Sequence, residues 1–283
     1  MISVATQVVV KRKSVQLLAP VVLAAAMLLP WASVQALPFT TDITITGTAD
    51  FRDGQAAATD VSQTGSYSVK QAGVTTTNTV NGTTVTGVDP LAALLTQTGD
   101  GVGITANVNS AIVGAQGEFP MDAGLSIFNS SVSNVYKIWL QFDYNHSVLA
   151  SGADAFVYSE YSLINRSDNN AMLLYRGVKS DTGTGYQDVL NGVNLGTQGA
   201  LVANNGSIFL ERIINSGELL NLTIQYDMSS GIFSDPGSID GRFTSFLSIV
   251  SVELFENAIP SPATLFLMLA GGIGLMASRR RRG

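Results

Sequence analysis

Residues 219–228 read LLNLTIQYDM, and their side chains alternate between apolar and polar with a period of two. The even positions hold Leu220, Leu222, Ile224, Tyr226 and Met228, whereas the odd positions from 221 to 227 hold asparagine, threonine, glutamine and aspartate. Successive side chains of a strand point to opposite faces of its sheet, so this stretch predicts a half-buried β-strand.

The same period recurs over most of the chain between residues 40 and 256. It predicts further half-buried strands at residues 42–49, 102–108 and 135–144. Residues 155–164 and 207–214 are apolar on both faces, which is typical of central strands. In residues 243–255 the apolar phase changes by one position near Ile249, where we expect a β-bulge.

Glycine-containing pairs separate these segments and mark turns. Asn81-Gly82 predicts a hairpin between residues 74–80 and 83–88. One helix is expected, because Asp89 can cap its start, Pro90 suits its first position and Gly99 can end it. Many short strands with regular turns predict an all-β fold, a β-sandwich or jelly-roll-like single domain over residues 37–257.

Charge and composition exclude several classes of function. The chain has no cysteine and one histidine, so cysteine nucleophiles and cysteine-ligated metals are ruled out. Residues 37–278 hold 8 basic and 21 acidic side chains, a net charge of −13. Such a surface repels phosphate backbones, so we expect no nucleic-acid partner.

The first 36 residues have the order of a secretory signal peptide. Lys11-Arg12-Lys13 precedes an apolar run from Leu17 to Leu29, and Val34 and Ala36 supply the small residues of a cleavage site. The run of 13 residues is short for a membrane span, which needs about 20. We therefore expect export by Sec-type machinery and cleavage after Ala36.

Residues 258–283 form a second membrane-directed segment. Residues 263–278 are uncharged and mostly apolar, which predicts a transmembrane helix, and Arg279, Arg280, Arg281 and Arg282 follow at once. Arginines resist translocation, so they hold this end in the cytoplasm and leave the bulk of the chain outside. Before the helix, Pro260 and Pro262 stiffen the backbone and prevent it from extending a strand.

The order Ile259-Pro260-Ser261-Pro262-Ala263-Thr264, then a short apolar helix, then an arginine cluster resembles the PEP-CTERM sorting signal. The resemblance covers residues 259–283, and Ser261 stands where the family has glutamate. It implies a bacterial substrate of an exosortase-like processing enzyme. Such a protein is anchored in the inner membrane by its C-terminal helix and then reaches the cell surface, in an organism that secretes exopolysaccharide.

Catalytic motifs are sparse. His146 follows a predicted strand and is expected in a loop, and the sequence has no Gly-x-Ser-x-Gly nucleophile elbow or phosphate-binding loop. Paired carboxylates can hydrolyse glycosides, and Asp143, Asp154 and Glu160 lie on or beside neighbouring predicted strands.

Two kinds of ligand can be considered from the remaining residues. Asp181, Asp235 and Asp240 lie in glycine-containing loops with the oxygen ligands that calcium prefers, so a structural calcium is one hypothesis and turn-forming aspartates the other. Exposed aromatic rings can stack on sugars or pack against a second sheet. The candidates are Trp139, Tyr158, Tyr161, Tyr175 and Tyr186.

Two classes of function remain open. The first is a non-catalytic exported surface or matrix protein, sorted by its C-terminal segment and binding exopolysaccharide. The second is a secreted, glycosidase-like hydrolase that acts on extracellular polymer. The sequence favours the first, because no catalytic constellation accompanies the carboxylates.

Overall fold

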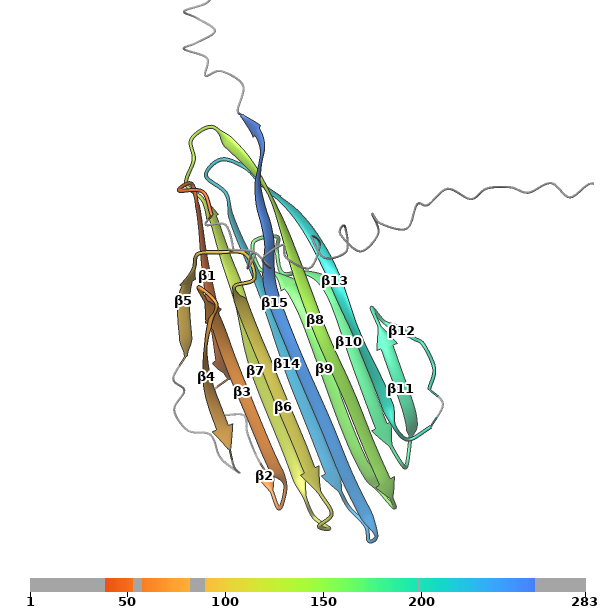
Figure 1. The fold of residues 1–283 in the computed structure, drawn as a ribbon. Helices are drawn as coiled ribbons and strands as arrows, with labels where there is room; N and C mark the ends of the chain where they lie inside the picture. The colour runs from red at the N-terminus through yellow and green to blue at the C-terminus, as the bar shows by residue number, and fades with distance from the viewer. Residues whose placement is uncertain (1–38, 53–57, 82–89, 198, 258–283) are drawn as a thin grey trace, which may run out of the picture. The chain divides into compact units, whose positions relative to one another are not determined.

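The computed structural model describes residues 39–52, 58–81, 90–197 and 199–257. These residues form an all-β fold of two antiparallel sheets, consistent with a β-sandwich (Figure 1). The expected signal peptide, the sorting motif with its helix, and the second strand of the 74–88 hairpin lie outside the described residues. Within the described ranges, no helix has the length and apolar character needed to cross a membrane.

The larger sheet has nine strands, all antiparallel to their neighbours. Its spatial order is β12 (Val193–Asn194), β11 (Gly185–Leu190), β10 (Ala171–Asp181), β9 (Ala155–Asn165), β14 (Leu219–Ile232), β7 (Gln116–Asn129), β1 (Ile43–Phe51) and β5 (Leu91–Leu95), with β2 (Ala58–Thr59) paired to β7.

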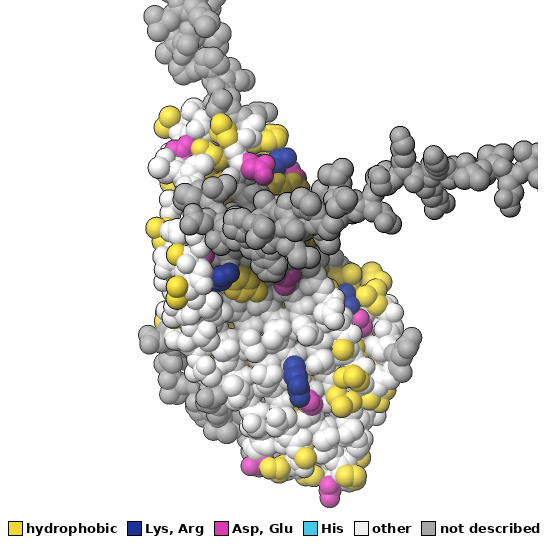
Figure 2. All heavy atoms as spheres, in the orientation of Figure 1, with side chains coloured by type: hydrophobic (Ala, Val, Ile, Leu, Met, Phe, Trp, Pro, Cys, Tyr) yellow, Lys and Arg dark blue, Asp and Glu magenta, His cyan; other side chains and the backbone are white. Residues whose placement is uncertain are grey.

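The smaller sheet has six strands and faces the viewer in Figures 1 and 2. Its spatial order is β13 (Val202–Ile214), β8 (Asn134–Gly152), β15 (Gly237–Asn257), β6 (Gly101–Ser110), β3 (Ser62–Gln71) and β4 (Val74–Asn81).

The core lies between the two sheets and consists of the side chains that the alternation predicts. In β14 all five even-positioned side chains from Leu220 to Met228 are buried, and each contributes roughly 1.5–3 kcal/mol on burial. Across the core, the rings of Tyr226 and Phe243 stack with centroids 4.2 Å apart. The predicted bulge is confirmed, because the β15–β8 register shifts between Ile249 and Ser251.

The prediction that residues 207–214 form a central strand is wrong. They belong to β13, which pairs only with β8 and is the edge of the six-stranded sheet. Its inward residues are partly covered, but Phe209 and Ile213 face solvent. A two-faced apolar pattern therefore marks an exposed edge here. By contrast, residues 155–164 do form a central strand, β9, between β10 and β14.

The helix expected from Asp89 to Gly99 is also wrong, because residues 91–95 form β5. This short strand pairs with β1, where Leu95 lies opposite Ile45 and is buried. Leucine and alanine favour a helix in isolation, but the free backbone of β1 and the burial of Leu95 outweigh that local preference.

A buried carboxylate holds the loops at this end of β5. Asp100 is fully buried and accepts hydrogen bonds from four backbone N–H groups, at 3.0 Å from Ala72, 3.3 Å from Gly73, 3.0 Å from Thr96 and 3.2 Å from Gln97. The side chain therefore ties the β3–β4 turn to the β5–β6 connection.

We predict that Asp100→Ala lowers the free energy of unfolding by about 2–4 kcal/mol, because four backbone N–H groups lose their shared, buried acceptor. Urea titration of the two proteins measures the difference. Asp240→Ala, which removes an exposed pair with Arg242, is the control and should leave stability nearly unchanged. Equal midpoints for Asp100→Ala and the parent chain would contradict this role.

Candidate functional site

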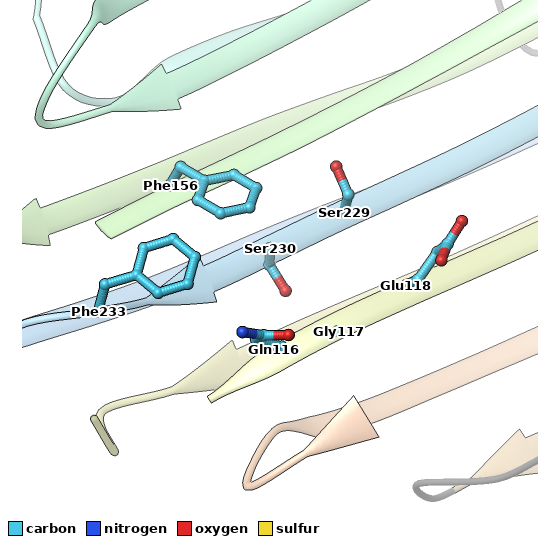
Figure 3. A pocket seen from close by; sticks show the side chains of 7 residues that line it. All are labelled: Gln116, Gly117, Glu118, Phe156, Ser229, Ser230 and Phe233. Carbon is cyan, nitrogen blue, oxygen red and sulfur yellow. The ribbon is translucent and has the colours of Figure 1, made fainter. Parts of the chain in front are cut away.

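The outer face of the nine-stranded sheet is hollowed at the end where β9 begins and β14 ends. One depression, of about 270 Å³, is lined by Gln116, Gly117, Glu118, Phe156, Ser229, Ser230 and Phe233 (Figure 3). A second, of about 460 Å³, is lined by Phe156, Tyr158, Lys179, Asp181 and Gln187. Because Phe156 lines both, the two depressions flank one aromatic ring.

A third depression, of about 510 Å³, lies farther across the sheet and is lined by Met172, Leu173, Tyr175, Asn191 and Gly192. Tyr175 in its wall contacts Tyr158 in the second depression, with the two hydroxyl oxygens 2.6 Å apart. Four rings therefore run from the first depression to the third. We call Phe233, Phe156, Tyr158 and Tyr175 the aromatic row.

Glycine makes room for the first half of the aromatic row. The rings of Phe156 and Phe233 stack with centroids 5.8 Å apart and planes inclined by 24°, and Figure 3 shows them side by side. A Cβ atom at Gly231 would lie 2.7 Å from Phe156 Cε1 and 3.1 Å from Phe233 Cζ. Only glycine at this position lets both rings lie against the sheet.

The second half of the aromatic row is held by hydrogen bonds around Glu160. Tyr175 donates to Glu160 Oε2 at 2.6 Å, and Tyr158 donates to the same oxygen. A Cβ atom at Gly177 would lie 2.9 Å from the Tyr175 hydroxyl and 3.2 Å from that of Tyr158, so this glycine leaves space for both tyrosines. The three side chains fix one another's orientation.

The two tyrosines stay protonated. Burial, together with the hydrogen bond to Glu160, raises the pKa of both Tyr158 and Tyr175 above the ordinary value. A phenol with a raised pKa is a poor nucleophile but a good hydrogen-bond donor and a flat apolar surface. The cluster therefore suits binding better than catalysis.

Ion pairs border the aromatic row on two sides. Lys179 Nζ lies 3.0 Å from Asp181 Oδ2. Partial burial acts to raise the pKa of Asp181, but hydrogen bonds from Thr184, Lys179 and Gly183 outweigh it and hold that pKa below the ordinary value. Both oxygens of Asp181 are therefore occupied by contacts within its own turn and with Lys179.

On the other side, Arg52 pairs with Asp122 at 3.0 Å and with Asp227 at 2.8 Å. Burial raises the pKa of Asp122 and of Asp227 despite the neighbouring guanidinium. Asp227 lies directly opposite Glu160 in the β14–β9 register. The polar cluster beside the aromatic row therefore consists of Glu160, Asp227, Asp122 and the arginine that the two aspartates share.

The carboxylates proposed from the sequence as a hydrolytic pair are not brought together. Glu160 accepts hydrogen bonds from the two tyrosines of the aromatic row, whereas Asp143 lies on the outer face of the opposite sheet and accepts hydrogen bonds from Gln141. Asp154 lies in the β8–β9 turn and accepts a hydrogen bond from Ser234. Glu160 is six residues farther along β9, which is about 20 Å of extended chain.

The candidate sugar-stacking aromatics are divided by the fold. Tyr158 and Tyr175 meet in the aromatic row. Tyr161 is buried in the core, Tyr186 lies on β11 with its side chain on the other side from Gln187, and half-buried Trp139 is on the outer face of the six-stranded sheet. Sequence reasoning missed Phe156 and Phe233, although Phe156 shares the phase of Tyr158 and Glu160.

The residues considered for calcium do not form a site. Asp181 is occupied by its turn, Asp240 pairs with Arg242 at 3.1 Å, and Asp235 precedes Pro236 in a separate turn. Over the part of the chain that the structure describes, no three acidic or histidine side chains are grouped to hold a metal ion.

His146 is not in a loop, as the sequence predicted, but inside β8 and fully buried. The position continues the inward phase of Phe142, which the polar neighbours in the sequence obscure. Nε2 of His146 lies 2.6 Å from Ser159 Oγ on β9, and that oxygen lies 3.0 Å from the Tyr226 hydroxyl on β14. This polar link joins the two sheets inside the core.

The comparisons with known proteins found no family model and no curated protein that matches the chain. A structure of infectious bursal disease virus, Gt strain, is 9% identical, covers 82% of this chain and 72% of that chain, and has a TM-score of 0.16. The VP2 subviral particle of the same virus is also 9% identical, with 84% and 73% covered and a TM-score of 0.16. Scores this low carry no argument about fold or function.

We predict that His146 makes the fold sensitive to acid. Burial, with a contribution from Arg176, lowers the pKa of His146 to about 3, so the unfolded chain binds a proton more readily than the folded chain below about pH 6.5. Stability is therefore complete above pH 6.5 and falls as the pH drops toward 3, by up to about 5 kcal/mol.

Urea titrations between pH 7 and pH 4.5 measure this loss, in a range above the ordinary pKa values of carboxylates. His146→Asn, which has no titratable group, should lose less stability over the same interval. Equal slopes for the two proteins would show that the acid sensitivity arises elsewhere.

Proposed function

We propose that this chain is an exported, non-catalytic bacterial surface or extracellular-matrix protein that binds exopolysaccharide along the aromatic row. The observation that carries the proposal is the row itself, with four rings linking three depressions on one sheet face. Sugar rings present apolar faces edged by hydroxyl groups. Aromatic rings beside hydrogen-bonding side chains match that chemistry.

The side chains between the rings support the same class of ligand. Gln187, Ser229 and Glu118 line the first two depressions and offer hydrogen bonds to hydroxyl groups. Each depression is shallow and opens on the sheet face, which suits an extended polymer that lies across several strands. The bordering cations, Arg52 and Lys179, are already paired with aspartates.

We also propose that the terminal segments direct sorting. The chain would then consist of a signal peptide over residues 1–36, a jelly-roll-like extracytoplasmic domain over 37–257 and a PEP-CTERM-like segment over 258–283. Pro260, Ser261, Pro262, Ala263 and Thr264 form the processing motif for an exosortase-like enzyme. The protein is then held in the inner membrane until it is processed and transferred to the cell surface.

The direction of the strands is compatible with this arrangement. The start of β1 and the end of β15 lie at the same end of the sandwich (Figure 1). Ile43 pairs with Asn129 and Asn257 with Asn134, and these two partners flank the β7–β8 turn. The depression around Phe233 lies near the start of β15, whose 21 residues span about 70 Å. An anchored chain would thus present the Phe233 end of the aromatic row away from the membrane.

The alternative of a glycosidase-like hydrolase has less support. Asp143, Asp154 and Glu160 occupy separate places in the fold, and Glu160 already accepts two tyrosine hydroxyls. No contact in the described residues favours turnover over binding.

We predict that Phe156→Ala combined with Phe233→Ala weakens binding to exopolysaccharide roughly tenfold, because two stacking surfaces are removed. A glycan array identifies the polymer, and affinity electrophoresis of the exported chain in gels containing it measures the loss. Trp139→Ala, on the opposite sheet, is the matched control and should bind normally. Loss with Trp139→Ala but not with the double variant would move the site to the other face.

We also predict that deletion of residues 263–283 releases the protein from the membrane fraction of the producing cell, because the apolar run and the arginine cluster are removed together. Fractionation followed by immunoblotting measures the release, with the full chain as the reference. Retention of the truncated protein in the bilayer fraction would contradict the anchoring role. Mass spectrometry of the mature protein tests processing separately, since an intact end at Arg282-Gly283 excludes it.

A further inference from the structure

Six large apolar side chains are exposed at the end of the sandwich from which the chain leaves β15. We call them the tail-proximal rim: Phe128 (40% exposed), Val132 (94%), Ile213 (44%), Leu219 (45%), Leu254 (51%) and Phe255 (45%). Large apolar side chains that are exposed together at one end of the sandwich are unfavourable in water. Their position therefore indicates a contact surface.

Strand pairing places the rim at one end from both sheets. In the nine-stranded sheet, Leu219 lies opposite Phe128 where β14 begins and β7 ends. In the six-stranded sheet, Ile213 on β13 and Leu254 on β15 lie on either side of the first residues of β8. Val132 lies in the turn that joins β7 to β8, between the two groups.

The sequence that follows β15 sets how far this rim can be from a membrane. Asn257 ends β15, and the uncharged apolar run begins at Ala263. The five residues between them reach at most about 18 Å when fully extended. Once residues 263–278 are inserted in the bilayer, the end of the sandwich that carries the rim lies within about 18 Å of its surface.

We propose that the tail-proximal rim rests in the interfacial layer of the bilayer while the chain is anchored. This inference rests on the proposed function, because it requires the C-terminal segment to be a membrane anchor. The rim would orient the sandwich upright, and the Phe233 end of the aromatic row would lie at the far end of the strands.

The charged side chains at this end fit a membrane surface rather than its interior. Lys137 Nζ lies 4.8 Å from the centre of the Phe255 ring and 3.0 Å from Glu211 Oε1. The ammonium group therefore contacts the rim, and the Glu211 carboxylate neutralises its charge. Glu218, next to Leu219 at the start of β14, and Glu253 on β15 add negative charge nearby. The rim should therefore bind zwitterionic lipid and gain nothing from anionic lipid.

The natural absence of cysteine allows a direct test. The full-length chain is reconstituted into phosphatidylcholine vesicles with a single environment-sensitive fluorophore on Val132→Cys. The matched control carries the fluorophore on Val113→Cys, because Val113 is also exposed (45%) but lies in the turn at the opposite end. Spin-labelled lipids in the vesicles quench only a fluorophore that contacts the bilayer.

We expect quenching at position 132 to exceed that at position 113 at least threefold, and Leu254→Ser with Phe255→Ser to reduce it. Equal quenching at the two positions, while the chain still floats with the vesicles, overturns the rim inference but leaves the anchor intact. A chain that does not float overturns both. A change at position 132 that grows with protein concentration without lipid assigns the rim to a second copy and also overturns the inference.

Discussion

The two-residue alternation of side chains in a β-strand is the constraint on which the rest of this structure depends. A slip of one residue in β14 or β9 would bring the polar set into the core and expose the apolar set, so one register is strongly preferred. The same phase that buries Tyr161 must turn Phe156, Tyr158 and Glu160 outward. The candidate binding face is thus a consequence of how the core is formed.

Two polar contacts complement this apolar constraint. The link from His146 through Ser159 to Tyr226 joins the sheets at one place in the core, and Asp100 fixes two connections at the edge. Buried polar groups are costly unless they are paired, so a shifted packing of the sheets would leave these groups without partners. Both contacts therefore favour one arrangement over alternatives that bury similar apolar area.

The long antiparallel strands also separate the two proposed tasks, binding and anchoring, in space. The rim and the exit of the chain lie at one end, whereas the first depression of the aromatic row lies at the other. A second shift in the β15–β8 register, between Leu254 and Glu256, leaves Phe255 without a partner residue on β8 and exposed near the end of β15. If the chain is anchored as we propose, one end would face the membrane and the other would face the polymer.

The sequence by itself determined which residues form most strands, which side of most strands is buried, and where β15 has its bulge. These properties depend on neighbouring residues, so their period can be read locally. Tertiary structure decided that β13 is an edge, that residues 91–95 are a strand, that His146 is buried, and that Phe156 and Phe233 meet Tyr158 and Tyr175. Those outcomes depend on which strands pair and how sheets pack, and a period of two specifies the face of a strand but never its neighbours.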